Sequence, residues 1–125
     1  MKKIYTDGFT IGKNPSNTGG GFVLIVEENA KIYVERIFKT NFTNNEAELC
    51  GLNKASQFAS EGDWILSDSF TAIAWVHRGN CKARPDLCQM AKDAKDNCEY
   101  KNLILKHIPR ELNIAGNYID STLKG

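Results

Sequence analysis

The chain has 125 residues, of which 42% are hydrophobic and 25% are charged, and its formal net charge is +1. This length allows one domain with one core, and this composition excludes disordered, fibrous and disulfide-rich classes. We therefore expect residues 1–125 to form a single domain and a monomer. The sequence has no apolar run long enough to cross a bilayer and no signal-peptide pattern, which predicts a cytoplasmic protein without a membrane partner.

Neither the cysteines nor the basic residues predict a site by themselves. The four cysteines match no zinc-binding spacing and no secretion signal accompanies them, so we expect reduced thiols packed as small apolar groups. Positive charge concentrates only in "HRGNCKAR" (77–84), where a solvated loop would give the same pattern. A net charge near zero neither predicts nor excludes a polyanionic partner.

The first half of the chain predicts three strands and a helix. Residues 3–7 form a short strand that ends in Asp7, and a loop rich in Gly, Asn and Thr follows it. The β-branched and aromatic runs at 21–28 and 31–40, separated by a short turn, predict an antiparallel hairpin. From about 45 to 60 the apolar residues recur at helical spacing.

The second half predicts a strand, two helices, a strand and a last helix. The apolar run at 63–68 indicates a buried strand, and 69–79 indicates a helix that Gly79 ends. Residues 84–98 begin near a proline and have one apolar face, which indicates another helix. The run at 102–108 is the last strand, and a helix begins at about 114.

This order of elements predicts an α/β domain built on one mixed sheet. The first three strands form an antiparallel meander. A helix between two strands favours a right-handed crossover to a parallel neighbour, so the later strands add in parallel. Helices then cover the faces of the sheet.

Asp7 and Asp68 both follow predicted strands, in "IYTDG" and "ILSDS". Ligands of open α/β sheets bind beyond the carboxyl ends of parallel strands, so these two carboxylates would face each other if their strands are parallel neighbours. Two simpler interpretations remain open at this point. Asp7-Gly8 is a common turn dipeptide, and Asp68 can cap the helix that follows it.

Glu48 lies inside the apolar stripe of the helix at 45–60. At about 100° per residue, Leu49, Leu52 and Ala55 share one face with Glu48, while Glu46 points roughly the other way and is the expected exposed acid. A carboxylate inside an apolar stripe is costly unless a metal or a positive charge compensates it. The alternative is a solvated acid that the helix dipole favours in the first turns.

Three carboxylates brought together repel each other, and a hard divalent cation is their natural compensation. Clusters of this kind serve phosphoryl transfer, in which two metal ions activate the attacking water and stabilise the leaving oxygen. The acids alone therefore predict a phosphodiester substrate.

The ordered pieces "IYTDG", "GGGFVLIV", "TNNEAEL", "ILSDS" and "IPRELNIAGN" resemble ribonuclease H of type 1 over essentially the whole chain. The resemblance implies a ribonuclease H-like fold with a five-stranded mixed sheet flanked by helices. It implies hydrolysis of the RNA strand of RNA–DNA hybrids, with two Mg²⁺ ions per site when substrate is bound and Mn²⁺ as a substitute. Asp7, Glu48 and Asp68 match three of the four acids that hold the metals in this family.

The fourth acid of the family pattern is absent, because Asn117 takes its place in "NIAGN". By pattern, Asn117 faces the site as a catalytic and metal-binding residue that offers an uncharged carbonyl oxygen. Asp120 lies one turn further along and reaches the site only if the helix shifts. The loss of one negative charge is expected to weaken metal binding and slow turnover.

Other parts of the family pattern concern the nucleic acid. Thr43, Asn44 and Asn45 match its groove- and phosphate-contacting positions, and Asn14 or Asn17 in the first loop is a further candidate for minor-groove contact. Asn45 can instead cap the helix that carries Glu48. The basic handle helix of some members is missing, and His107, at a strand end, is expected to be structural.

Four functions follow from these patterns. The first is an endoribonuclease on RNA–DNA hybrids that gives 5′-phosphate and 3′-hydroxyl ends. The second is a weak or inactive binding module that has kept the groove contacts, although three crowded acids would bring it no advantage. The third is a protein–protein interaction domain, which requires the ordered motifs to be a coincidence, and the fourth is a nuclease of the same fold acting on another nucleic acid.

Overall fold

The computed structural model describes residues 1–123 and contains a five-stranded sheet in the order β3-β2-β1-β4-β5. β1 pairs antiparallel with β2, and β2 with β3, whereas β1–β4 and β4–β5 are parallel. The mixed sheet predicted from the order of elements is therefore confirmed. Its strands are β1 Lys3–Thr10, β2 Gly20–Val26, β3 Lys31–Ile37, β4 Trp64–Ser67 and β5 Ile104–His107.

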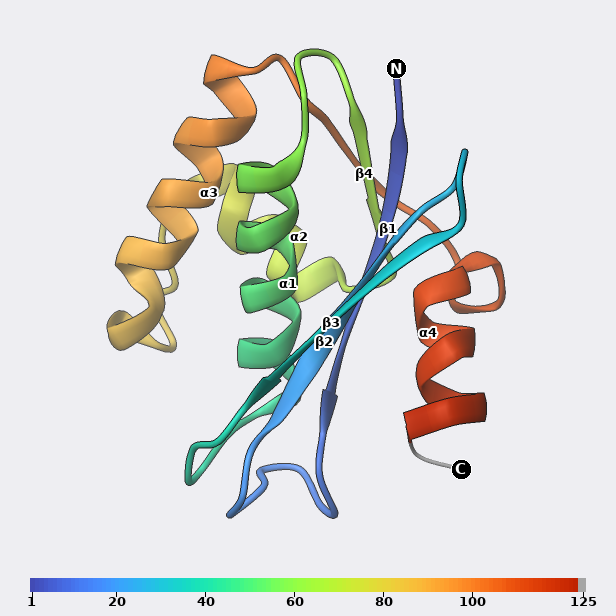
Figure 1. Ribbon diagram of the computed structural model, residues 1–125. Coiled ribbons are helices and arrows are strands. Elements are labelled where there is room, and N and C mark those ends of the chain that lie inside the picture. The colour runs from blue at the N-terminus through green and yellow to red at the C-terminus, as the bar shows by residue number, and fades with distance from the viewer. Residues whose placement is uncertain (124–125) are drawn as a thin grey trace.

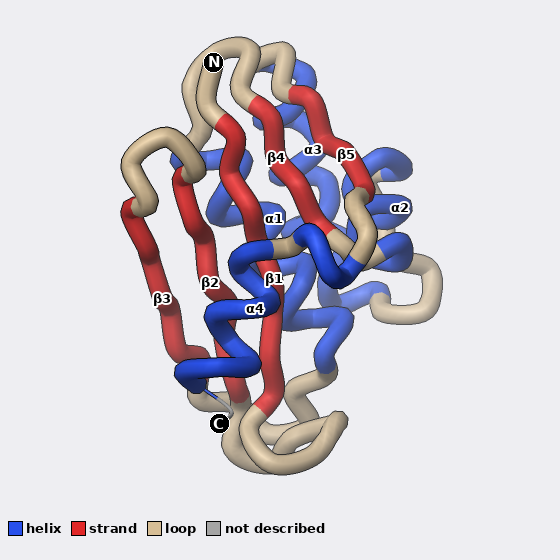
Figure 2. The backbone as a smooth tube through the Cα atoms, turned by 90° about the vertical axis from the view of Figure 1, so that its right-hand side faces the viewer, coloured by secondary structure: helices blue, strands red, loops and turns tan. Residues whose placement is uncertain are grey.

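The helices lie on both faces of this sheet, and their bounds are α1 Asn44–Phe58, α2 Phe70–Arg78, α3 Cys88–Tyr100 and α4 Ile114–Tyr118. Short 3₁₀ turns precede α3 and α4, at Pro85–Leu87 and Arg110–Leu112, and α4 continues as one π-helical turn, Ile119–Leu123. Figure 1 shows α1, α2 and α3 on one face and α4 on the other. In Figure 2, α4 crosses in front of β1 and β2. Within the described residues, no helix combines the length and the apolar character that a membrane crossing requires.

Two cores lie on opposite sides of the sheet. The larger one joins the sheet to α1, α2 and α3, and it includes Phe22, Leu49, Leu52 and Ile65. The smaller one lies beneath α4 and consists of Phe9, Val23, Ile25, Ala115 and Ile119. The strands β1 and β2 contribute to both because alternate side chains point to opposite faces.

β1 is longer than the sequence predicted, because it does not end at Asp7 but continues to Thr10. Its parallel pairing with β4 covers only Lys3–Tyr5, whereas its antiparallel pairing with β2 continues to Thr10. Asp7 therefore lies inside a strand, just past the point where β4 diverges. Ligand-binding crevices of open α/β sheets form at such an edge, beyond the carboxyl ends of the parallel strands.

Gly8 lets α1 approach β1 closely at the same point. A Cβ added at Gly8 would lie 2.6 Å from both the carbonyl carbon of Ala47 and the amide nitrogen of Glu48. Since no side chain fits there, only glycine allows the backbone of the helix to touch the strand. The contact brings the first turns of α1, with Glu48, beside Asp7.

Candidate active site

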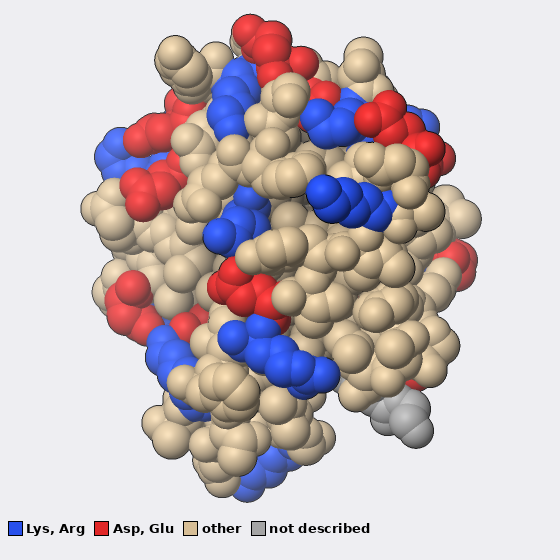
Figure 3. Space-filling model, in the orientation of Figure 1, with Lys and Arg blue, Asp and Glu red and all other residues tan. Residues whose placement is uncertain are grey.

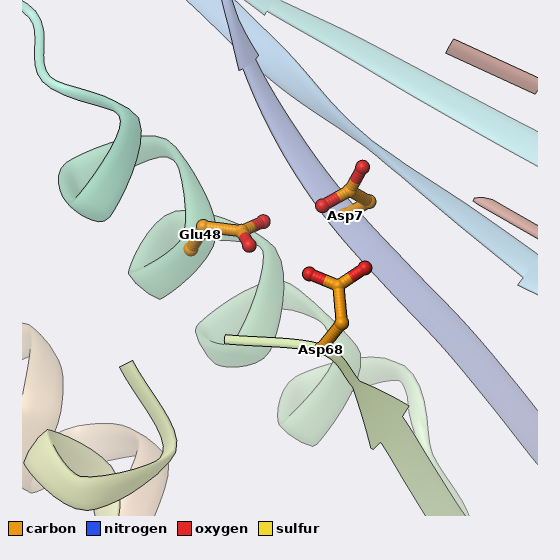
Figure 4. A group of neighbouring side chains, drawn as sticks. All are labelled: Asp7, Glu48 and Asp68. Atoms are coloured by element: carbon orange, nitrogen blue, oxygen red, sulfur yellow. The ribbon is translucent and has the colours of Figure 1, made fainter. Parts of the chain in front are cut away.

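Three carboxylates from three different elements converge beside the point where β1 and β4 separate. Asp7 comes from β1, Glu48 from α1, and Asp68 from the residue after β4; one oxygen of each lies within 4.8 Å of the others. Figure 4 shows the three side chains pointing toward one another. The convergence that helix phase and strand ends predicted is thus present in the structure.

The two simpler interpretations of the aspartates do not describe this structure. Asp7-Gly8 is not a turn, since both residues pair with β2 inside a continuous ladder. Asp68 is not the helix cap, because the Ser69 side chain accepts the hydrogen bond from the amide of Ala72 at 3.1 Å. Asp68 is therefore free to turn toward Asp7 and Glu48.

Burial and mutual repulsion make two of these acids hard to ionise. Asp7 and Glu48 have only 2% and 5% of their surface exposed. Burial raises the pKa of Glu48 well above its usual range, and the charges of Asp7 and Asp68 raise it further. Burial also raises the pKa of Asp7, against the opposing effect of nearby hydrogen bonds. A compensating cation would relieve both groups.

The donor set suits a hard divalent cation such as Mg²⁺ or Mn²⁺. All of the clustered donors are carboxylate oxygens, which these cations prefer over nitrogen or sulfur. The backbone N–H of Gly8 donates to Oε1 of Glu48 and fixes the direction of that carboxylate. The residues present therefore fit the cofactor that the family resemblance implies.

Arg110 and Asn113 also belong to this cluster, although no role was predicted for either. Nη1 of Arg110 donates to Oδ2 of Asp7 at 2.6 Å and to Oδ2 of Asp68 at 3.3 Å. The fully buried amide of Asn113 donates to the carbonyl of Thr6 and to Oδ2 of Asp68, both at 3.0 Å. Both residues lie in the family-like segment "PRELN", which is the signal that could have identified them.

Asn113 also fixes α4 to the sheet. Its Oδ1 accepts a hydrogen bond from the amide of Ala115 at 3.1 Å and thereby caps the first turn of α4. One side chain thus connects the start of α4, the backbone of β1 and the Asp68 carboxylate. This amide sets where α4 begins relative to the acids.

Asn117 and Asp120 differ in how they relate to the site. The Asn117 side chain is exposed, and within the part of the chain that the structure describes no hydrogen bond joins it to the three acids. The exposed carboxylate of Asp120 accepts from Nη2 of Arg110 at 3.1 and 3.3 Å. Asp120 therefore reaches Asp7 through a guanidinium, without any shift of the helix.

The residues predicted to contact nucleic acid gather at the amino end of α1. Asn14 from the first loop accepts a hydrogen bond from the amide of Asn44 at 2.9 Å. The N-cap is Thr43, whose hydroxyl accepts from the amide of Glu46 at 3.1 Å, and Asn45 is exposed. The capping role considered for Asn45 therefore falls to Thr43.

Glu46 is not the exposed acid that the helix phase predicted, because only 3% of its surface is accessible. Lys39 and Arg84 cover its carboxylate, and the contact from Nη2 of Arg84 to Oε1 is 3.0 Å. Nη1 of Arg84 also donates to the hydroxyl of Thr43 at 3.3 Å. Two cations from outside the helix thus cover Glu46 at the amino end of α1, where periodicity alone predicts solvent.

Two further features concern the surface of the molecule: a stacked pair of rings and the distribution of charge. His107, at the end of β5, stacks on the exposed ring of Phe70 with 3.6 Å between the centroids. On the face that Figure 3 shows, acidic and basic side chains are mixed, with no wide area of one sign. A polyanion binding this face would meet individual cations rather than a continuous basic surface.

Comparison with known proteins links this arrangement to one fold. No protein-family model and no curated protein matches the sequence. Among solved structures, the ribonuclease H1 of the halophilic archaeon Halobacterium salinarum is 23% identical, with a TM-score of 0.70 over 98% of this chain and 97% of that chain. LC11-RNase H1, which was isolated from compost by a metagenomic approach, also matches.

LC11-RNase H1, in a structure with an RNA/DNA hybrid, is 22% identical to this chain, with a TM-score of 0.71 over 98% of this chain and 99% of that chain. The N-terminal RNase H domain of rv2228c from Mycobacterium tuberculosis is 22% identical, with a TM-score of 0.67 over 93% and 92% of the two chains. These likenesses span nearly the whole chain on both sides. The ribonuclease H-like fold expected from the motifs is confirmed.

Proposed function

We propose that this chain is a type 1 ribonuclease H, a metal-dependent endoribonuclease that hydrolyses the RNA strand of RNA–DNA hybrids. The observation that carries the proposal is the convergence of Asp7, Glu48 and Asp68 within 4.8 Å on a ribonuclease H-like fold. The ordered family motifs in the sequence support it independently. One of the structurally similar proteins was solved with an RNA/DNA hybrid.

In this proposal, Asp7, Glu48 and Asp68 hold two Mg²⁺ ions, or Mn²⁺ in their place, and Asn117 is a weak neutral ligand. When bound, the cations would activate water for in-line attack and stabilise the leaving 3′-oxygen, which gives 5′-phosphate and 3′-hydroxyl ends. The chain itself orients the ligands: the Gly8 amide holds Glu48, and the Asn113 amide holds Asp68. Such preorganisation removes the cost of aligning the carboxylates at each turnover.

The amino end of α1 is the proposed contact with the minor groove of the hybrid. Asn14, Thr43, Asn44 and Asn45 offer small polar groups there, which suit 2′-hydroxyls and base edges. Arg84 lies against Thr43 and adds positive charge where a phosphate would approach. This surface lies at the amino end of α1, the helix that also carries Glu48, so substrate bound there would lie close to the acid cluster.

A catalytically weak or inactive nucleic-acid-binding module is the second candidate. Two observations favour it: the fourth acid of the pattern is the uncharged Asn117, and Arg110 already pairs with Asp7 and Asp68. Such a module would keep the groove contacts on α1 without turnover.

The deciding experiment is cleavage of an end-labelled RNA–DNA hybrid in Mg²⁺ and in Mn²⁺. The chain as it stands is compared with Asn117→Asp, and Asp68→Asn serves as the inactive control. We expect slow cleavage by the unaltered chain and at least about ten-fold faster cleavage by Asn117→Asp, because a fourth carboxylate binds the cations more strongly. Asp68→Asn should not cleave.

Three results would contradict parts of this proposal. No cleavage by either active form, with tight hybrid binding retained, would establish the binding module instead. Equal rates for the unaltered chain and Asn117→Asp would remove Asn117 from the site. Cleavage that persists in EDTA would exclude the metal-dependent mechanism.

A further inference from the structure

The guanidinium of Arg110 lies between the clustered acids and Asp120. Its Nη1 contacts Oδ2 of Asp7 at 2.6 Å and Oδ2 of Asp68 at 3.3 Å. Its Nη2 contacts the Asp120 carboxylate at 3.1 Å. The planar fork of arginine suits this role, because its two nitrogens point in fixed and different directions.

The carboxylate oxygens that Nη1 contacts belong to two of the three residues that could hold a metal. An oxygen lone pair used by an N–H donor is not free for a cation, and the Arg110 charge also repels a second cation. Oδ2 of Asp68 is further occupied by the Asn113 amide. Metal binding to Asp7 and Asp68 through these oxygens therefore requires Nη1 to withdraw.

Arg110 has room to withdraw, and a second partner is in place. Its side chain is 48% exposed, and Asp120, on the solvent side, is 57% exposed. A guanidinium that leaves Asp7 can remain paired with Asp120 through Nη2. The displaced charge then stays at the rim of the site.

Gly116 on α4 makes the inner position of Arg110 possible. A Cβ added at Gly116 would lie 2.8 Å from Nη1 of Arg110 and 3.0 Å from Oδ2 of Asp7. The guanidinium therefore packs directly on the helix backbone, and any side chain at position 116 would crowd it.

We propose that Arg110 is a built-in counter-cation that competes with divalent metal for Asp7 and Asp68. It offsets part of the negative charge of Asp7 and Asp68 in the metal-free protein, and it raises the metal concentration needed to fill the site. Asp120 holds the guanidinium nearby after displacement. This inference rests on the proposed function in one respect, namely that the acids bind a divalent metal.

The test is a calorimetric titration of the metal-stripped full chain with Mn²⁺, with Arg110→Gln beside the unaltered chain. Arg110→Gln should bind Mn²⁺ about ten-fold more tightly, because the metal no longer breaks charge-assisted hydrogen bonds. Arg78→Gln is the matched control, since Arg78 is exposed at the end of α2 and its replacement by glutamine removes the same single positive charge. The control should change the affinity by less than about two-fold.

A second readout does not depend on activity or on metal. In EDTA, Arg110→Gln should melt at a lower temperature than the unaltered chain, because Asp7 loses its nearest counter-charge. Should that variant fail to fold in EDTA, Gly116→Ala keeps every charge and crowds Nη1 more closely than it crowds Asp7. Gly116→Ala is then expected to tighten Mn²⁺ binding about two- to three-fold.

Two outcomes would overturn the inference, and they are distinguishable. If the unaltered chain binds Mn²⁺ and Arg110→Gln binds it equally or more weakly, Arg110 does not compete and the proposed function stands. If neither folded form binds Mn²⁺, the metal site itself fails, and the counter-cation and the proposed function fall together.

Discussion

Two of the three clustered carboxylates, Asp7 and Glu48, are almost completely removed from solvent. Within residues 1–123, the positive charge that lies against the cluster is that of Arg110, and it is shared between Asp7 and Asp68. Arg110 contacts Asp7 and Asp68, but no hydrogen bond joins it to Glu48 in the described residues. Glu48 relies on the Gly8 amide and on Asp7 beside it. A buried acid without a counter-charge favours its protonated form, so the folded metal-free protein holds protons that the unfolded chain releases.

Stability of the metal-free protein should therefore fall as pH rises. The folded pKa of Glu48 lies above its unfolded value of about 4.5, so its stabilising contribution is complete below pH 4.5 and is lost as pH rises through the folded pKa. The slope is at most about 1.4 kcal/mol per pH unit for one proton. Urea denaturation in EDTA across this range measures it.

The Glu48→Gln variant is the control for this pH dependence. Glutamine keeps the shape and can still accept from the Gly8 amide, but it cannot ionise. We expect a flatter pH profile and a higher free energy of unfolding at neutral pH, because the variant has no buried carboxylate to ionise. An unchanged slope in Glu48→Gln would show that another group titrates.

The neighbouring Glu46 marks a limit of sequence reasoning at this scale. Helix phase placed Glu48 on the buried face of α1 correctly, because the apolar stripe that surrounds it is local to that helix. The same phase was wrong for Glu46, since the cover over Glu46 comes from Lys39 and Arg84 in other segments. Periodicity predicts which face of its own helix a side chain occupies, but whether that side chain is buried also depends on contacts from other segments.

The carbonyl groups at the carboxyl end of α1 accept hydrogen bonds from the lysine that follows α3. Nζ of Lys101, which follows α3, donates to the carbonyls of Ser56, Gln57 and Ala59 at 2.8, 2.7 and 2.9 Å. α1 has no basic residue in its own last turn. Lys101 therefore satisfies carbonyls that a helix end leaves unpaired and complements the dipole there.

Replacing Lys101 by methionine should destabilise the protein by roughly 1–2 kcal/mol, because three carbonyls lose their donor and its charge. Lys92→Met is the matched control, since Lys92 is exposed and pairs with the exposed Asp96 at 3.1 Å on α3. The control should cost no more than about 0.5 kcal/mol. Urea midpoints at equal denaturant slope compare the two, and equal losses would refute the capping role of Lys101.

The order of the helices and strands was predictable because each element has a local sequence signature. The residues at which an element begins and ends were not always predictable. β1 was expected to end at Asp7, since the residues that follow are rich in Gly, Asn and Thr and favour a loop. It continues to Thr10 because Gly20–Val23 of β2 supplies partners for it. Strand length is decided by the neighbouring strand, which the local sequence does not contain.

In the whole molecule, α1, α2 and α3 cover one face of the sheet and α4 covers the other. The acid cluster receives side chains from both of these helical layers. α1 brings Glu48 from one layer, while the segment leading into α4 brings Arg110 and Asn113 from the other. The sequence showed three acids on elements that could converge. It did not show the cation and the amide opposite them, because Arg110 and Asp7 are 103 residues apart.

That separation has a kinetic consequence for folding. Asp7, Glu48 and Asp68 come together only after the chain has closed the crossover between β1 and β4 and packed α1 against it. Contacts that close long loops tend to form late, so the cluster should be incomplete in the transition state for folding. A metal bound to the cluster would then lower the rate of unfolding and leave the rate of folding unchanged.

In stopped-flow experiments at an Mn²⁺ concentration about ten times its dissociation constant, unfolding should slow roughly ten-fold while the refolding rate stays the same. Faster refolding would instead mean that the long-range pairing of β1 and β4 forms before the rate-limiting step.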